Sequence, residues 1–305
     1  MKQPEFGLQP PMAGVAPVSP RVRIPGATLN RTMNTHVCHK ILLCLALATA
    51  ACTTRSLAEE TGSGHYAPGA MASIIDTLPT KPGLAVANYF MYYDGNASAN
   101  PVQFAGLTAL DAHARAYSDS LLIMYDTKLE LLGASYVPAV AIPYVWLKVD
   151  GKVTASGGGT INMRDTANGI GDMTLYPMML AWHKGDFKYD LRFGLYAPTG
   201  DYEEFRLANI GKNYWTFEPA GSISWFSSKF GLEATAFAGF DISTKNNTTD
   251  YQSGDVFHFD ATVAEHLPVG KLGIVGVGAN AFVYQQVTGD SGSGALLGGF
   301  EGRTV

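Results

Sequence analysis

The chain has 305 residues, of which 47% are hydrophobic and 15% charged, and its formal net charge is −5. Residues 1–58 hold six of the 21 basic and one of the 26 acidic residues, so residues 59–305 carry a net charge of −10. This acidic balance argues against a nucleic-acid partner, which needs clustered Lys and Arg. It suits a cell-envelope protein with acidic loops.

A secretory signal peptide is predicted over residues 33–58. It contains a short region that ends in Lys40, an apolar run of eleven residues and the small-residue string Ser56-Leu57-Ala58. The apolar run is too short to cross a bilayer as a helix, and we expect cleavage after Ala58. Residues 1–32 are rich in proline and show no helix or strand period. We interpret them as a mis-annotated start upstream of Met33 or as a disordered extension.

All three cysteines lie inside this leader, at Cys38, Cys44 and Cys52. A lipidated Cys52 is an alternative, although the residues before it match a lipoprotein cleavage box poorly. Cleavage after Ala58 leaves a chain without cysteine. Neither a disulfide framework nor a cysteine metal site is then available.

Residues 59–83 are rich in Gly, Pro and Ala, and predict an N-terminal segment that is periplasmic or lumenal. Residues 84–305 then predict a succession of β-strands. Proline at 138 and 143 indicates a bend or bulge in the third of them. The strand-like runs are 84–93, 115–126, 129–149, 170–183, 187–196, 214–226, 231–242, 253–266, 271–284 and 293–305.

The clearest alternation lies in residues 231–242, where one face is apolar and the other carries charge. A period of two is typical of a β-strand, because successive side chains point to opposite faces. The apolar face is the core in a soluble sandwich, but it faces lipid in an outer-membrane barrel. The apolar positions are Leu232, Ala234, Ala236, Ala238, Phe240 and Ile242, and the opposite positions are Glu233, Thr235, Phe237, Gly239 and Asp241.

The predicted connections decide between these two interpretations. They alternate strictly between short and long, as periplasmic turns and extracellular loops do. No run of 18 apolar residues follows the leader, which excludes a membrane-spanning helix. We therefore predict an all-β fold, an antiparallel up-and-down transmembrane β-barrel with about 10 strands in this chain. The short connections are 127–128, 184–186, 227–230 and 267–270, and the long ones are 94–114, 150–169, 197–213, 243–252 and 285–292.

Four strings occur in an order that resembles the outer-membrane proteins associated with meta-pathway phenol degradation, the SphA-like family. The resemblance runs from about His65 onward and implies a β-barrel in the outer membrane of a Gram-negative bacterium, linked to uptake of small apolar or aromatic compounds. It supplies no catalytic residues. It also implies about two more strands after Val305, hence about 12 in the complete protein. The strings are G-I-G-D-M-T-L-Y-P at 169–177, A-P-T-G-D-Y at 197–202, G-K-N-Y-W-T-F at 211–217, and T-D-Y-Q-S-G at 249–254 with F-H-F-D at 257–260.

Alternation alone predicts which polar residues would line a lumen and tune what passes. The alternative is a network of paired charges that only fills the lumen. The lumen-lining candidates are Asp172, Asp190, Arg192, Glu218, Glu233, Asp241, His258, Asp260 and His266. The loop that carries the second family string consists of Pro198, Thr199, Gly200, Asp201 and Tyr202.

No catalytic residue, metal or cofactor is predicted. His258 and Asp260 share a face, but His266 lies roughly 26 Å further along an extended strand, so one ion cannot bind both histidines. The expected partners are outer-membrane lipid, small apolar or aromatic solutes and the barrel assembly machinery. Two other functions stay open. One is a lipase-like barrel enzyme that pairs Ser222 or Ser224 with His258, and the other is a periplasmic lipocalin-like binding protein.

Overall fold

The computed structural model describes residues 59–71, 82–97, 102–154, 159–269 and 273–297. The predictions for residues 1–58, including the signal peptide and the cysteines, lie outside these ranges. None of the helices in the described ranges is long and apolar enough to cross a membrane.

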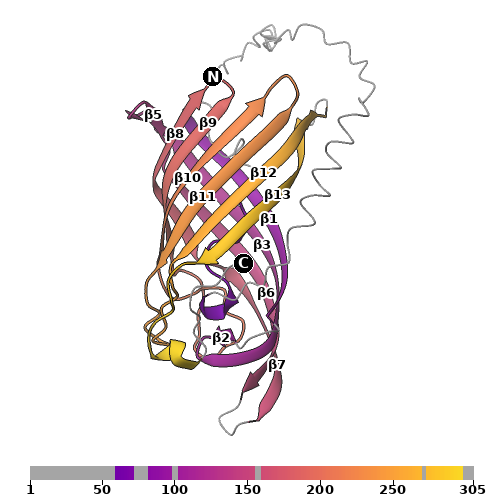
Figure 1. Ribbon diagram of the computed structural model, residues 1–305, viewed down its shortest axis with the longest axis vertical. Coiled ribbons are helices and arrows are strands. Elements are labelled where there is room, and N and C mark those ends of the chain that lie inside the picture. The colour runs from indigo at the N-terminus through magenta and orange to yellow at the C-terminus, as the bar shows by residue number, and fades with distance from the viewer. Residues whose placement is uncertain (1–58, 72–81, 98–101, 155–158, 270–272, 298–305) are drawn as a thin grey trace, which may run out of the picture. The chain divides into compact units, whose positions relative to one another are not determined.

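The described residues form one antiparallel sheet that curls around an interior (Figure 1). Its main path runs β1-β3-β6-β8-β9-β10-β11-β12-β13, so most neighbours along the path are also neighbours in sequence. The predicted all-β, antiparallel fold is confirmed. The strands are β1 (Gly83–Ala97), β2 (Val102–Phe104), β3 (Leu107–Asp126), β4 (Glu130–Leu131), β5 (Ala134–Tyr136), β6 (Ala139–Thr154), β7 (Thr160–Ile170), β8 (Met173–Lys184), β9 (Phe187–Ala197), β10 (Thr216–Ser227), β11 (Leu232–Ser243), β12 (Val256–Pro268) and β13 (Ile274–Gln286).

Short and long connections lie at opposite ends of the sheet. The turns between β8 and β9, β10 and β11, and β12 and β13 lie at one end. The longer connections lie at the opposite end, together with β2, β7 and the short 3₁₀ helix η3 (Ser293–Leu297) (Figure 1). This segregation is the pattern of periplasmic turns and extracellular loops.

Four of the predicted ranges were wrong in detail. The predicted loop 94–114 contains the end of β1, the whole of β2 and the start of β3. The run 129–149 breaks into β4, β5 and β6. The strands β4 and β5 form a small hairpin that turns at Leu132 and Gly133, and the break before β6 contains Pro138, which has no N–H to donate. The predicted loop 150–169 is mostly the end of β6 and the start of β7, which pair as a hairpin. The predicted tenth strand, 293–305, begins instead as η3, and residues 298–305 lie outside the described ranges. The main path therefore has nine strands.

The two faces of the wall carry opposite chemistry. Along β11 the odd-numbered side chains from Glu233 to Ser243 are buried, while Ala234 and Ile242 on the other face are exposed. The same exposure holds for large apolar side chains across the wall, among them Leu191, Ile223, Phe257 and Val263. Burying polar groups and exposing apolar ones is the inverse of a soluble protein and suits a wall in contact with lipid.

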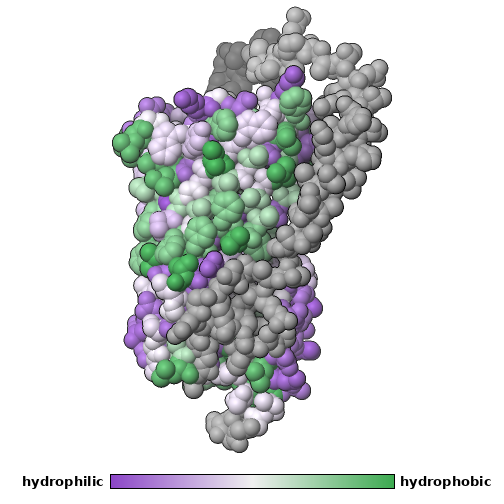
Figure 2. All heavy atoms as spheres, viewed as in Figure 1, coloured by the Kyte–Doolittle hydropathy of each residue, from purple (hydrophilic) through white to green (hydrophobic). Residues whose placement is uncertain are grey.

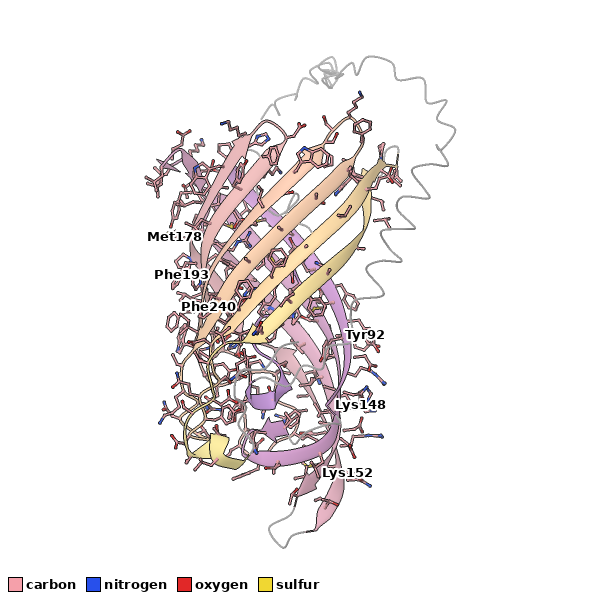
Figure 3. All side chains as sticks on the ribbon, in the orientation of Figure 1. Tyr92, Lys148, Lys152, Met178, Phe193 and Phe240 are labelled. Carbon is pink, nitrogen blue, oxygen red and sulfur yellow. The ribbon has the colours of Figure 1, made fainter. Side chains whose placement is uncertain are left out.

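The exposed apolar side chains form a band rather than scattered patches. Figure 2 shows this band across the strands, with hydrophilic residues at both ends of them. Met178, Phe193 and Phe240 lie on the wall, whereas Lys148 and Lys152 lie further along towards β7 (Figure 3). A band between two polar rims is the signature of an outer-membrane barrel.

Candidate functional site: the inner face and the N-terminal segment

The inner face, defined as the buried face of β8 to β13, gathers most of the predicted polar residues. Eight of the nine candidates are buried, and His266 is half-buried. A buried charge is costly unless it is paired, so each should have a partner. The buried candidates are Asp172, Asp190, Arg192, Glu218, Glu233, Asp241, His258 and Asp260.

Four of the nine candidates form two side-chain pairs on the inner face. Arg192 makes two hydrogen bonds to Asp190, Nε to Oδ1 at 2.6 Å and Nη2 to Oδ2 at 2.8 Å. Its guanidinium also lies over the rings of Tyr176 and Phe237. His266 Nε2 lies 2.6 Å from Glu233 Oε2. These contacts match the alternative in which paired charges fill the interior.

Residues 59–71, called the N-terminal segment below, lie against the inner face. The segment begins with the 3₁₀ helix η1 (Glu60–Gly62). Buried Glu59 accepts a hydrogen bond from Tyr284 Oη at 2.9 Å, and Asn246 Nδ2 donates to Glu60 Oε2 at 2.9 Å. Burial and nearby Asp241 raise the pKa of Glu59 to about 8. Burial also raises the pKa of Glu60.

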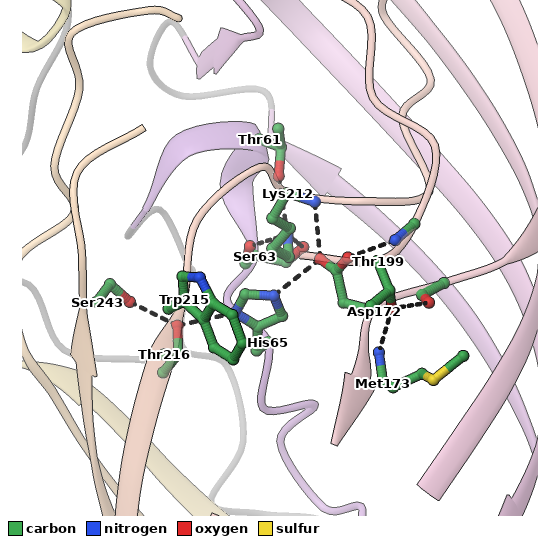
Figure 4. Close-up of polar contacts among 12 residues, drawn as sticks. Thr61, Ser63, His65, Asp172, Met173, Thr199, Lys212, Trp215, Thr216 and Ser243 are labelled. Carbon is green, nitrogen blue, oxygen red and sulfur yellow. Dashed lines mark hydrogen bonds and ion pairs between the residues drawn. The ribbon is translucent and has the colours of Figure 1, made fainter. Parts of the chain in front are cut away.

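Asp172 anchors the middle of the segment (Figure 4). Its Oδ2 lies 2.9 Å from His65 Nε2 and accepts from the backbone N–H of Lys212 at 2.8 Å, while its Oδ1 accepts from the N–H of Gly200 at 2.8 Å. Burial favours a raised pKa for Asp172, but the hydrogen bonds from His65, Gly200 and Lys212 outweigh it and hold the pKa below its usual range. Asp172 is therefore an ionised carboxylate with three donors.

The ionised Asp172 selects the tautomer of the His65 imidazole. Burial lowers the pKa of His65, so its imidazole is neutral near pH 7. Because a carboxylate only accepts, Nε2 carries the proton and Nδ1 accepts from Thr216 Oγ1, 2.8 Å away. Ser243 Oγ lies 2.9 Å beyond Thr216 Oγ1 and completes the chain (Figure 4).

The family strings converge on this anchor. Thr199 Oγ1 donates to the carbonyl of Gly171 at 3.1 Å. Gly200 and Gly211 pack backbone against backbone, since a Cβ on Gly200 would lie 2.7 Å from the Cα of Gly211. Lys212 reaches the segment, where its Nζ donates to Thr61 Oγ1 at 3.0 Å. Three separate strings thus meet around one carboxylate.

The last part of the segment is held by Asp260. Tyr66 donates its hydroxyl proton to Asp260 Oδ2, and the N–H groups of Gly69 and Met71 donate to the same carboxylate at 3.3 Å each. The Tyr66 ring stacks on His258 with 3.8 Å between ring centroids and 13° between planes. Asp260 thus binds the segment and is not a partner of His258.

His258 belongs to a cluster that sequence reasoning missed. Its Nε2 lies 3.1 Å from Glu218 Oε1 and 3.5 Å from Asp241 Oδ1, and all three side chains are essentially buried. Glu218, Asp241 and His258 offer ligand atoms within 4.8 Å of one another, which is close enough to hold a metal ion. Alternation along β12 places His258 and Asp260 on one face, but it carries no signal for a cluster that joins β10, β11 and β12.

The chain matches a known protein family over most of its length. A family model described as "Putative MetA-pathway of phenol degradation" matches residues 94–305. The chain belongs to this family. The match includes every string that carried the resemblance, although it begins at residue 94 rather than near His65. The family's model therefore covers the anchor at Asp172 and leaves out the N-terminal segment.

One solved structure is similar over much of the chain. It is the crystal structure of an outer-membrane channel from Pseudomonas putida F1, which is 15% identical. The similarity covers 75% of this chain and 76% of that chain, with a TM-score of 0.47. A comparison with curated proteins gave no match.

Proposed function

We propose that the protein is an outer-membrane channel through which small apolar or aromatic compounds of the phenol type cross passively. Membership of the phenol-degradation family over residues 94–305 carries this proposal. The apolar outer band and the polar inner face support residence in the outer membrane. In this proposal the inner face lines the lumen, and the barrel assembly machinery inserts the protein.

Aromatic rings gathered where the N-terminal segment meets the inner face support an aromatic solute. Tyr66, Phe237 and Tyr284 belong to one buried cluster, and Tyr196 and Tyr214 flank His65 at 5.1 Å between ring centroids. Rings in offset-stacked or edge-to-face arrangements attract one another by about 0.5–1.5 kcal/mol beyond their area burial. Such weak, repeated contacts allow a phenol-sized ring to bind and to leave.

The lipase-like alternative needs a serine paired with His258, but Ser222 and Ser224 have other hydrogen-bond partners. Ser222 Oγ donates to Asp190, and Ser224 Oγ accepts from Thr235 at 2.8 Å. His258 is paired with Glu218 and Asp241 instead. A lipocalin-like binder is disfavoured because its apolar face would line the interior, whereas here the apolar face is outside.

Uptake measurements test the proposal. Cells that lack the gene and cells that express it are given radiolabelled phenol at a limiting concentration, with glycerol as a hydrophilic control solute of similar size. We expect faster phenol uptake with the protein and little change for glycerol. Equal phenol rates in the two strains, with the barrel present in the outer membrane, would contradict the channel.

A further inference from the structure

We propose that Glu218, Asp241 and His258 bind a divalent transition-metal ion, of which Zn²⁺ is the best match. The three residues come from the adjacent strands β10, β11 and β12. The donor set is one imidazole nitrogen and two carboxylates, a mixture that suits zinc-like ions rather than Mg²⁺ or Ca²⁺. Three protein ligands leave a fourth position for water.

The separations between ligand atoms fit one ion. Tetrahedral zinc ligands at about 2.1 Å from the metal lie about 3.4 Å from one another. His258 Nε2 lies 3.1 Å from Glu218 Oε1 and 3.5 Å from Asp241 Oδ1, on either side of that value. The ligand atoms of Glu218 and Asp241 also lie within 4.8 Å of each other.

The same atoms lie within ion-pair distance of one another, yet none of them makes a hydrogen bond of good geometry among the described residues. The buried atoms without a hydrogen bond are Glu218 Oε1, both carboxylate oxygens of Asp241 and both ring nitrogens of His258. Buried polar atoms are nearly always satisfied, so five orphans in one place require an explanation. A divalent cation accounts for four of the five, because it satisfies the three oxygens and His258 Nε2 together and balances the charge of two carboxylates.

Glycines on the neighbouring strands make room for the ligands. A Cβ on Gly239 would lie 2.3 Å from Cε1 of His258, so only glycine allows the imidazole to lie there. A Cβ on Gly194 would lie 2.8 Å from Oε2 of Glu218. Tyr66 stacks on the imidazole and covers it, which fixes the ring plane while its nitrogens stay free to bind. The site is thus shaped by Gly194 of β9, by Gly239 of the ligand-bearing strand β11 and by Tyr66 of the N-terminal segment.

Metal content is the test. The protein is purified in detergent, stripped with EDTA, dialysed against Zn²⁺ in excess Mg²⁺ and analysed by elemental mass spectrometry. We expect one Zn²⁺ per chain for the native protein and for Glu233→Gln, which removes a carboxylate from the same inner face. Asp241→Asn and His258→Gln should lose this zinc. Co²⁺ should give the intense visible absorption of a tetrahedral site only where zinc binds.

Two outcomes would overturn the proposal. The first is native protein that retains no more zinc than Asp241→Asn, in which case His258 is an imidazolium ion held between two carboxylates. The second is a native protein whose thermal midpoint does not change with zinc. This measurement is also the one that applies if the variants fail to fold, as judged by heat-modifiable gel mobility. The native protein alone then decides, because a bound ion must raise its thermal midpoint over the EDTA-treated form. No zinc-dependent shift would reject the site.

Discussion

Single carboxylates hold the N-terminal segment, each in a different protonation state. Asp172 is ionised because three donors converge on it, while burial raises the pKa of Glu59 to about 8. The two residues therefore respond to different pH ranges. Asp172 holds the segment throughout the physiological range, whereas Glu59 makes its docking sensitive to pH.

Docking of the segment should weaken as pH rises. The docked segment keeps Glu59 protonated until about pH 8, while an undocked Glu59 ionises near its usual pKa of 4.5. The stabilisation is therefore complete below 4.5, falls as pH rises towards 8, and is constant above that. Neighbouring Lys212 opposes the shift, and Asp241 and Asp290 reinforce it.

A fluorescent label on Ala70→Cys measures this effect, because the chain's other cysteines lie in the predicted leader. We expect its anisotropy to fall between pH 5 and pH 9, and Glu59→Gln to abolish most of that change. Glu203→Gln, in an exposed loop, should keep it. The same pH response in Glu59→Gln and the native protein would show that another group controls docking.

At the scale of the strand, β11 shows how an alternating sequence serves two environments. Its exposed face offers small and apolar side chains to lipid, and its buried face offers Glu233, Asp241 and the gap at Gly239 to the interior. Gly239 lies opposite His258 in the ladder between β11 and β12. The imidazole fills the space that a side chain would take.

Gly239→Ala should destabilise the barrel. The new methyl group would overlap His258 and force it from its place, at a cost of about 1–3 kcal/mol typical of overpacking. The control is Gly159→Ala, where a Cβ would meet nothing within 4 Å. We expect the temperature at which the protein loses the gel mobility of its folded form to fall only for Gly239→Ala. An unchanged midpoint would mean that the His258 ring has room to move.

At the scale of the whole wall, location decides what an exposed apolar residue does. Leu191 on β9 and Ile161 on β7 are both aliphatic, with relative exposures of 49% and 58%. Leu191 lies on the main path of the sheet, whereas Ile161 lies on β7, which pairs only with β6 and extends beyond the other strands (Figure 1). Only the first position is expected to contact lipid.

Leu191→Arg should therefore cost about 2–4 kcal/mol of folding free energy in a bilayer, the usual penalty for Arg near the midplane. Ile161→Arg should change it by about 0–1 kcal/mol, as at a polar rim. Urea-dependent folding into lipid vesicles measures both. Equal penalties would place the membrane band elsewhere on the wall. Release of the native protein by carbonate washing without detergent would remove the membrane assignment altogether.

Particular residues show which parts of the fold can be predicted from the sequence alone. The alternation in 231–242 was enough to predict β11 and to divide Glu233 and Asp241 from Ile242. The division by connection length predicted which face meets lipid. The stretch 293–297 shows the limit, because a short Gly-rich apolar run carries no period that separates a strand from η3.

What the sequence by itself determined is therefore the period, the two faces and the family, since each depends on local order along the chain. Only the tertiary structure decided the partners. Asp172 meets His65 across 107 positions, and Tyr66 meets Asp260 across 194. Glu218, Asp241 and His258 meet because the register of three strands aligns them. Such contacts depend on how strands pair, which alternation along one strand cannot specify.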